Sequence, residues 1–184
     1  MPLFTASSSL PGVTAIDLYC EYPAGKIDIE REQQRLREHD VLVFMFPIYW
    51  YSTPSILKEW QDLVLEYGFA YGHEATALKD KIFMCALTAG GPEESYQSQG
   101  FNHYSIRELL RPIEQTMEFC GMTCIAPYAL FSSRLAVEER RIDQYINDWL
   151  SLLSALKNEN FDIEKSRLLT ILNRDLDSLI GDNQ

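Results

Sequence analysis

Two short loops carry the residues best suited to hold a ligand. Residues 47–52 (PIYWYS) follow an apolar run and offer flat aromatic side chains together with backbone N–H groups. Residues 88–93 (TAGGPE) follow a second apolar run, and their two glycines let a planar ligand approach the backbone closely. In open α/β sheets, ligands bind beyond the carboxyl ends of the strands. The two loops together therefore predict a site for a flat heteroaromatic ring.

Each loop taken alone has a commoner explanation. An aromatic triplet such as Tyr49-Trp50-Tyr51 lies more often in a core or an interface than under a cofactor. A glycine pair such as Gly90-Gly91 usually marks a turn. The ring-site interpretation therefore requires that the two loops face each other and that Trp50 is not buried in the interior.

The elements that must position these loops alternate along the chain. Apolar runs typical of strands covered on both faces occur at residues 12–19, 40–46, 81–87 and 123–130. A polar helix is expected at residues 29–38, and helical periodicity occurs at residues 54–64, 106–117 and 137–156, with a kink expected at Pro112. This alternation predicts an α/β fold with a doubly wound parallel sheet.

Composition restricts the partners and the compartment. A chain of 184 residues with 46% hydrophobic content can bury one domain core. The net charge of −11 repels nucleic-acid backbones and anionic lipid surfaces, so nucleic acid is not expected as a partner. The chain has no apolar stretch of membrane-spanning length and its first residues do not read as a secretory signal, so a cytoplasmic location is expected.

The cysteines and most histidines are not assigned chemistry. Four cysteines are too few for a disulfide scaffold, and Cys120 and Cys124 have no second ligand pair, so no metal site is predicted. All four are expected to be buried free thiols. His39 and His73 have no partner in the sequence and receive no role.

Four linked segments resemble the flavodoxin-like NAD(P)H:quinone oxidoreductases. In order, they are FPIYWYSTPSILKEW at 46–60, YGFAYG at 67–72, LTAGGPEESYQSQGFNHY at 87–104 and LLRPIEQTMEFCGM at 109–122. Within that family the chain is most similar to the ancillary proteins of glutathione-regulated potassium-efflux systems. The resemblance implies an FMN-binding homodimer with active sites at the subunit interface. It also implies a peripheral place at the inner membrane through an antiporter partner.

The resemblance assigns roles to individual residues. It gives flavin contacts to Pro47, Ile48, Tyr49, Trp50, Tyr51, Thr88, Ala89, Gly90, Gly91 and Tyr96. Tyr96 is the candidate catalytic hydrogen-bond donor to charge on the reduced ring. His103 is a second catalytic candidate, because some relatives carry a histidine at the neighbouring position, here Asn102. Trp50, Tyr51 and Tyr71 correspond to residues that line the pocket for nicotinamide and quinone.

One departure from the family pattern concerns the cofactor's phosphate. Family members open with a central strand, a loop and a helix N-terminus that hold the FMN phosphate. Residues 1–12 are too short to supply these, so the sheet is expected to lack its first, central strand. Three explanations remain open: a start downstream of the natural one, a divergent copy that has lost flavin, or replacement by another segment such as residues 157–184.

The sequence thus predicts two regions and leaves two functions open. Residues 1–156 form the flavodoxin-like domain, and residues 157–184 form a C-terminal helical extension with an apolar stripe from Leu168 to Ile180. The extension packs on its own domain or a dimer mate, or it docks another protein. The leading function is FMN-dependent two-electron transfer from NAD(P)H to a quinone. The alternative is a non-catalytic accessory or binding subunit that has lost flavin binding.

Overall fold

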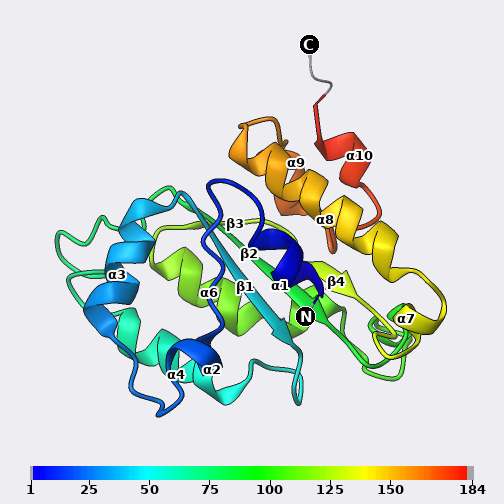
Figure 1. Cartoon of the computed structure of the whole chain (residues 1–184), viewed down its shortest axis with the longest axis horizontal. Coiled ribbons are helices and arrows are strands. Elements are labelled where there is room, and N and C mark those ends of the chain that lie inside the picture. Colours follow the sequence, from blue (N-terminus) through cyan, green and yellow to red (C-terminus); the bar gives the residue numbers. More distant parts are fainter. Residues whose placement is uncertain (1, 182–184) are drawn as a thin grey trace.

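The structure, a computed structural model, describes residues 2–181 (Figure 1). Met1 of the predicted domain and residues 182–184 of the predicted extension lie outside the described residues. Strands β1 (Val41–Pro47) and β2 (Ile82–Thr88) run parallel and pair along their whole length. The short strands β3 (Thr123–Cys124) and β4 (Tyr128–Leu130) pair with the other side of β2. The strands predicted at 40–46 and 81–87 are therefore confirmed.

Helices cover both faces of this sheet. On β2, Phe83, Cys85 and Leu87 face one hydrophobic core, and Met84 and Ala86 face the other. The first face packs against helices α3 (Ile29–Glu38), α4 (Ser55–Val64) and α6 (Arg111–Phe119). The second face packs against α1 (Pro2–Ser7) and α8 (Ile142–Lys157). The predicted α/β fold with a parallel sheet is confirmed.

The remaining helices are short. They are α2 (Leu18–Glu21), α5 (Ile106–Leu109), α7 (Leu135–Glu138), α9 (Ile163–Leu168), α10 (Leu176–Leu179) and the 3₁₀ turn η1 (Glu93–Ser95). The helix predicted at 106–117 is divided into α5 and α6 at Leu110, just before the expected kink at Pro112. The helix predicted at 137–156 begins only at Ile142, after the separate turn of α7.

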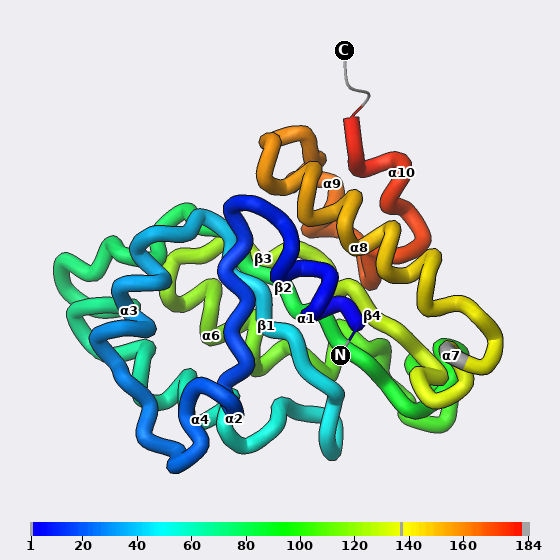
Figure 2. Tube along the Cα trace, in the orientation of Figure 1, coloured from blue at the N-terminus to red at the C-terminus, as the bar shows by residue number. Residues whose placement is uncertain are grey.

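The strand predicted at 12–19 does not form. Residues 13–17 join no strand pair in the described part of the chain, and the Asp17 carboxylate accepts the N–H groups of Tyr19 and Cys20 to begin α2. A strand needs a neighbour for its backbone groups, and among the described residues no strand pairs with the free side of β1. Figure 2 shows this N-terminal segment passing from α1 beside the start of β1, where Thr14 Oγ1 lies 2.8 Å from His39 Nε2. β1 is left as an edge strand, paired on one side.

The strand predicted at 123–130 is interrupted in its middle. The Ile125 N–H bonds to the Phe83 carbonyl of β2, and the Ala126 N–H, which faces the opposite side, bonds to the Ser166 carbonyl. Pro127 has no N–H to donate. The single strand is therefore replaced by β3 and β4.

The extension forms two short helices, so a single helical stripe from Leu168 to Ile180 is wrong. Leu172, Leu176 and Leu179 are buried in the second core, but Leu168 is 87% exposed. Between α9 and α10 the Leu172 N–H bonds to the Pro127 carbonyl, which anchors the chain beside β4. The extension thus packs on its own domain. It lies at the β4 edge and does not take the missing strand's place beside β1 (Figure 1).

Two composition-based expectations have structural outcomes. Cys85, Cys120 and Cys124 are buried free thiols, but Cys20 is exposed because it lies on the short surface helix α2. Within residues 2–181, no helix is long and apolar enough to cross a membrane.

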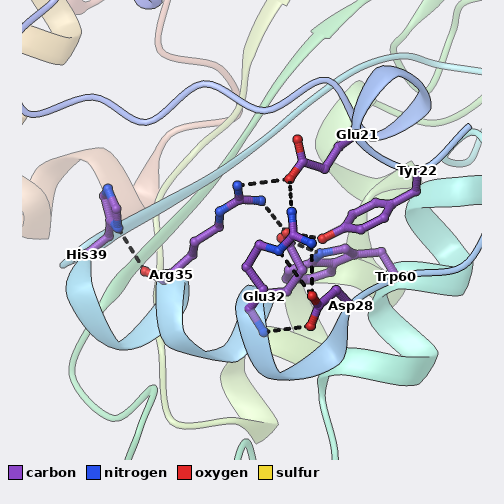
Figure 3. Close-up of polar contacts among 8 residues, drawn as sticks. Glu21, Tyr22, Asp28, Glu32, Arg35, His39 and Trp60 are labelled. Atoms are coloured by element: carbon purple, nitrogen blue, oxygen red, sulfur yellow. Dashed lines mark hydrogen bonds and ion pairs between the residues drawn. The ribbon is translucent and has the colours of Figure 1, made fainter.

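A buried carboxylate joins the three helical segments α2, α3 and α4 (Figure 3). Glu32 on α3 is 3% exposed and accepts the Tyr22 hydroxyl at 2.6 Å, Arg35 Nη1 at 2.6 Å and the Trp60 indole N–H at 2.9 Å. Tyr22 follows α2 directly and Trp60 lies on α4. Because α4 begins just after the aromatic loop, this cluster fixes the helix that anchors the loop.

The Tyr22 hydroxyl should make the free energy of unfolding depend on pH in the alkaline range. Burial, assisted by the hydrogen bond to Glu32, raises the pKa of Tyr22 to about 12, from an ordinary value of about 10. Because the pKa is higher in the folded state, this contribution to stability is fully present below about pH 10 and is lost as the pH rises through about 12. Urea unfolding across this range should show a steeper loss for the natural chain than for Tyr22→Phe. Equal pH dependence in the two proteins would contradict this assignment.

Candidate functional site

The aromatic loop is a tight turn with a strained backbone. The Tyr49 N–H bonds to the Ser52 carbonyl and the Ser52 N–H to the Tyr49 carbonyl, both at 2.9 Å. Between them, Trp50 has φ 45° and Tyr51 has φ 63°, as in the type I′ hairpin turn that favours Asn-Gly. Left-handed backbone costs a non-glycine residue about 1–2 kcal/mol. This strained turn places the Trp50 side chain on the surface, where it is 94% exposed. Backbone strain of this kind often marks a functional site.

The second loop is hydrogen-bonded to β4 and the residues after it, and the space over its first glycine is open. The buried Ala89 donates its N–H to the Leu130 carbonyl and accepts the Ser133 N–H, and the Gly91 carbonyl accepts the Ser132 N–H. A Cβ built on Gly90 would meet no atom within 4 Å. The chain therefore leaves space over Gly90 that a flat ligand could use.

The two loops meet because β1 and β2 are neighbours and both end at the same edge of the sheet. They line one open pocket of about 460 Å³. Its lining residues are Ile48, Trp50, Tyr51, Gly90, Gly91, Pro92, Ser95, Tyr96, Phe101 and Asn102. The Tyr51 hydroxyl donates to Asn102 Oδ1 at 3.1 Å, which links the first loop to the segment after the second. Trp50 is thus exposed at a pocket shared by both loops.

Tyr96 can act as a hydrogen-bond donor in this pocket. Its ring contacts Phe131, with ring centroids 5.3 Å apart, and lies 3.5 Å from the position of a Cβ on Gly91. Burial, with a smaller effect of Tyr51, raises the pKa of Tyr96 above its ordinary value. The phenol is therefore protonated at neutral pH.

Several sequence-predicted site residues do not line the pocket. Pro47 and Thr88 are paired residues at the strand ends, and Ala89 is buried behind the loop. Tyr49 is exposed beside the turn, and His103 lies on an exposed bend with φ 61°. Tyr71 packs between the rings of Tyr67 and Phe119, in an aromatic cluster of its own.

Four lining residues carried no predicted role: Pro92, Ser95, Phe101 and Asn102. Phe101 is 84% exposed, an unusual position for a phenylalanine, and it lies in the Gly-rich segment that follows the second loop. A phenylalanine in a polar, glycine-rich segment is the sequence signal that could have placed Phe101 at the pocket. Asn102 stood out only as the position where some relatives carry histidine.

The pocket fits the ring of FMN and not its phosphate. All ten lining residues are uncharged, and the aromatic side chains, the open face of Gly90 and the Tyr96 hydroxyl suit a planar, neutral, hydrogen-bonding heterocycle. A phosphate dianion needs cations or several free backbone N–H groups. No lysine, arginine or histidine lines this pocket.

The parallel sheet, its two helical layers and a pocket at the strand ends define an α/β protein of the flavodoxin type. The chain belongs to the flavodoxin-like fold family, whose model matches residues 3–153. It is 42% identical over 155 residues to the glutathione-regulated potassium-efflux system ancillary protein KefG of Cronobacter sakazakii, covering 81% of this chain and 84% of that protein.

Two solved structures are also similar. General stress protein 14 of Treponema denticola, solved in complex with FMN, matches with a TM-score of 0.78 and 37% identity, over 84% of this chain and 88% of that one. An NADPH-quinone reductase from P. pentosaceus matches with a TM-score of 0.67 and 27% identity, over 79% of this chain and 85% of that one.

Proposed function

We propose that this protein is an FMN-dependent NAD(P)H:quinone oxidoreductase. The observation that carries the proposal is the shared pocket, in which an exposed indole and an open glycine loop meet beyond the ends of paired parallel strands. One similar structure binds FMN and another is an NADPH-quinone reductase, and both support the same chemistry. Bound FMN would supply the two-electron chemistry that couples hydride donation by a nicotinamide to reduction of a quinone.

The chain's own residues bind and orient the ring in this proposal. Trp50 and Tyr51 cover one side of it, Gly90 and Gly91 allow the backbone to approach the other, and the Tyr96 hydroxyl donates a hydrogen bond at its edge. Tyr96 is protonated at neutral pH, so it can stabilise negative charge without transferring its proton. His103 lies outside the pocket lining, which leaves Tyr96 as the stronger catalytic candidate of the two.

The proposal includes a homodimer and an efflux-system partner. The pocket is open, and its rim carries exposed apolar rings such as Trp50 and Phe101, which a second copy would cover. Tyr71 would then reach the nicotinamide and quinone from the partner's side. The similarity to KefG supports attachment to a potassium-efflux antiporter, which would bring a cytoplasmic protein to the inner membrane.

A flavin titration tests the proposal directly. Flavin fluorescence is followed as the purified protein is added to FMN and, in parallel, to riboflavin. Because no cation lines the pocket, the two flavins should bind with similar affinity. The loaded protein should then reduce a benzoquinone with NADH or NADPH. Absence of binding to both flavins, or of quinone reduction with both nicotinamides, would overturn the enzymatic proposal.

Gly90→Ala should weaken flavin binding without destabilising the fold. The added Cβ meets no protein atom within 4 Å and Gly90 does not have a left-handed backbone, so the free energy of unfolding should be unchanged or rise by up to about 1 kcal/mol. The same methyl group would lie against a bound ring. We expect flavin affinity to fall by about tenfold, or about 1.4 kcal/mol.

The matched control for this prediction is Gln99→Ala, an exposed residue of the same segment that does not line the pocket. It should leave both stability and flavin affinity unchanged. Normal flavin affinity in Gly90→Ala would mean that the flavin ring does not lie against Gly90.

The uncharged lining also favours a second function, an accessory subunit that binds its partner without flavin. The two functions differ in a simple measurement. A non-catalytic subunit would bind the antiporter equally well when Gly90 is alanine and when flavin is absent. An enzyme would need about tenfold more FMN to reach half of its quinone-reduction rate in the same variant.

A further inference from the structure

The described part of the C-terminal extension, residues 157–181, reaches the second loop of the site through an ion pair between Arg174 and Glu93. It lies beyond the segment that the family model matches. It is fixed to the sheet at Ala126, whose N–H bonds to the Ser166 carbonyl at 3.2 Å, and at Ala129, whose N–H bonds to Asn173 Oδ1 at 2.9 Å. The next residue after Ala129, Leu130, holds Ala89 of the second loop. The position of the extension is therefore set by the strand that supports the loop.

Arg107 of α5 fixes the same extension from the other side. Its side chain is 10% exposed, and its Nε donates to Glu114 Oε1 at 2.8 Å. Its Nη1 donates to the carbonyls of Arg167, at 2.6 Å, and Leu169. Hydrogen bonds from an ionised guanidinium are among the stronger ones in proteins. The chain is thus held where α9 ends, a few residues before it reaches the loop.

Arg174 connects this fixed segment to the ring pocket. It follows Asn173, and its Nη2 lies 2.8 Å from Glu93 Oε1. Glu93 is the first residue of η1, and its carbonyl accepts the Tyr96 N–H at 2.9 Å. The guanidinium therefore holds the start of the turn whose end presents the Tyr96 phenol to the pocket.

A groove of about 1380 Å³ lies between the extension and α5, α6 and η1, and its cations have structural partners. Arg107 and Arg111 pair with Glu114, Arg167 pairs with Glu164, and Lys165 bonds to Ser178. These groups are engaged with the chain and do not form an anion receptor. Among the described residues, Arg174 to Glu93 is the ion pair that joins the extension to the loop.

We propose that Arg174 is a positioning residue for the ring pocket. Acting through Glu93, it holds the turn at residues 93–96 and so sets the place of the Tyr96 hydroxyl. The consequence for flavin rests on the function proposed above, whereas the restraint on the turn does not. The extension is accordingly part of the site's support, in addition to closing the sheet edge.

Amide hydrogen exchange of the flavin-free protein tests the restraint itself. Arg174→Gln should speed exchange of residues 92–98 by about threefold, the size expected of one exposed ion pair. Arg167→Gln, which removes a pair internal to α9, is the matched control and should leave residues 92–98 unchanged. Reversing the pair with Glu93→Arg and Arg174→Glu together should restore protection. Equal exchange in Arg174→Gln, the control and the natural chain would overturn the proposal.

Flavin affinity then tests the link to Tyr96. Arg174→Gln should weaken FMN binding by about threefold in the natural background, and Arg174→Lys should restore most of it. In a Tyr96→Phe background the same substitution should have no further effect, because the positioned hydroxyl is gone. An equal loss in both backgrounds would overturn the link to Tyr96. If no variant binds flavin, the proposed function fails, and the exchange experiment alone decides the inference.

Discussion

Replacing Trp50 and Tyr51 together by Asn and Gly should raise the free energy of unfolding and abolish flavin binding. Both residues have left-handed φ angles in a type I′ turn, and relief of that strain is worth about 1–2 kcal/mol per residue. The loss is small, because Trp50 is 94% exposed and Tyr51 gives up one hydrogen bond to Asn102, worth about 1 kcal/mol. The net gain should be about 1–3 kcal/mol.

The same variant should not retain the ring, because it removes the aromatic side of the pocket. Urea unfolding without flavin measures the gain, and fluorescence titration with FMN measures the loss. Glu74→Asn is the matched control: Glu74 is exposed, has φ 66° and lies outside the pocket lining, so this change relieves strain and should leave flavin affinity unchanged. A less stable variant, or one that binds FMN normally, would contradict the view that strain is kept here for binding.

Glu32→Ala should destabilise the fold by about 3–5 kcal/mol, the typical cost of removing one partner from a buried ion pair. The change leaves the Tyr22 hydroxyl and the Trp60 indole N–H without an acceptor in a site that is 3% exposed. Arg35 loses its nearest carboxylate, although it still pairs with Glu21 at 3.0 Å. Because Glu32 ties α2 and α3 to α4, the damage should extend to the start of α4 and the aromatic loop.

Chemical unfolding of Glu32→Ala and Glu30→Ala gives the comparison. Glu30 is exposed on the first turn of the same helix, so its removal should cost only about 0.3–1 kcal/mol. Similar losses in the two variants would mean that the cluster contributes little. Glu32→Gln, which keeps the shape and removes the charge, should fall between them.

The sequence predicted the central parts of the fold correctly because their signals are local. β1 and β2 are unbroken apolar runs of strand length. In the structure β2 is buried between two helical layers and β1 is half-buried. α4 carries clear helical periodicity, and α3 reads as a polar helix with a carboxylate cap at Asp28. The ring-binding loops follow from these strands, since ligand loops leave a parallel sheet at the carboxyl ends.

The errors concern segments whose structure depends on distant neighbours. Residues 12–19 have strand-like composition, but within residues 2–181 no strand pairs with residues 13–17, and α2 forms at the end of that run. Residues 168–180 have a helical stripe, but the contacts of Leu172 and Asn173 with β4 and the Pro127 carbonyl hold the middle of that stretch outside a helix. Neither outcome can be read from the segment itself.

The candidate site was only partly predictable for similar reasons. The positions of Trp50 and Gly90 beyond two strands indicated a ring pocket, but the left-handed turn that exposes Trp50 leaves no mark in the sequence. Glu32 lies in a helix that reads as polar throughout, and its burial depends on Tyr22 and Trp60 from other elements. Arg174 is similar, because its partner is 81 positions earlier in the chain (174 − 93).

The single-sided pairing of β1 has a consequence for handling this protein. Residues 41–46 (VLVFMF) form an uncharged, β-prone hexapeptide, and the described chain lays no strand along its free side. Natural edge strands are usually protected by charges, prolines or bulges, and short segments of this composition stack readily into cross-β fibrils. Warm or concentrated samples should therefore form thioflavin-positive fibrils that begin at this hexapeptide. Val43→Lys should slow the growth of these fibrils.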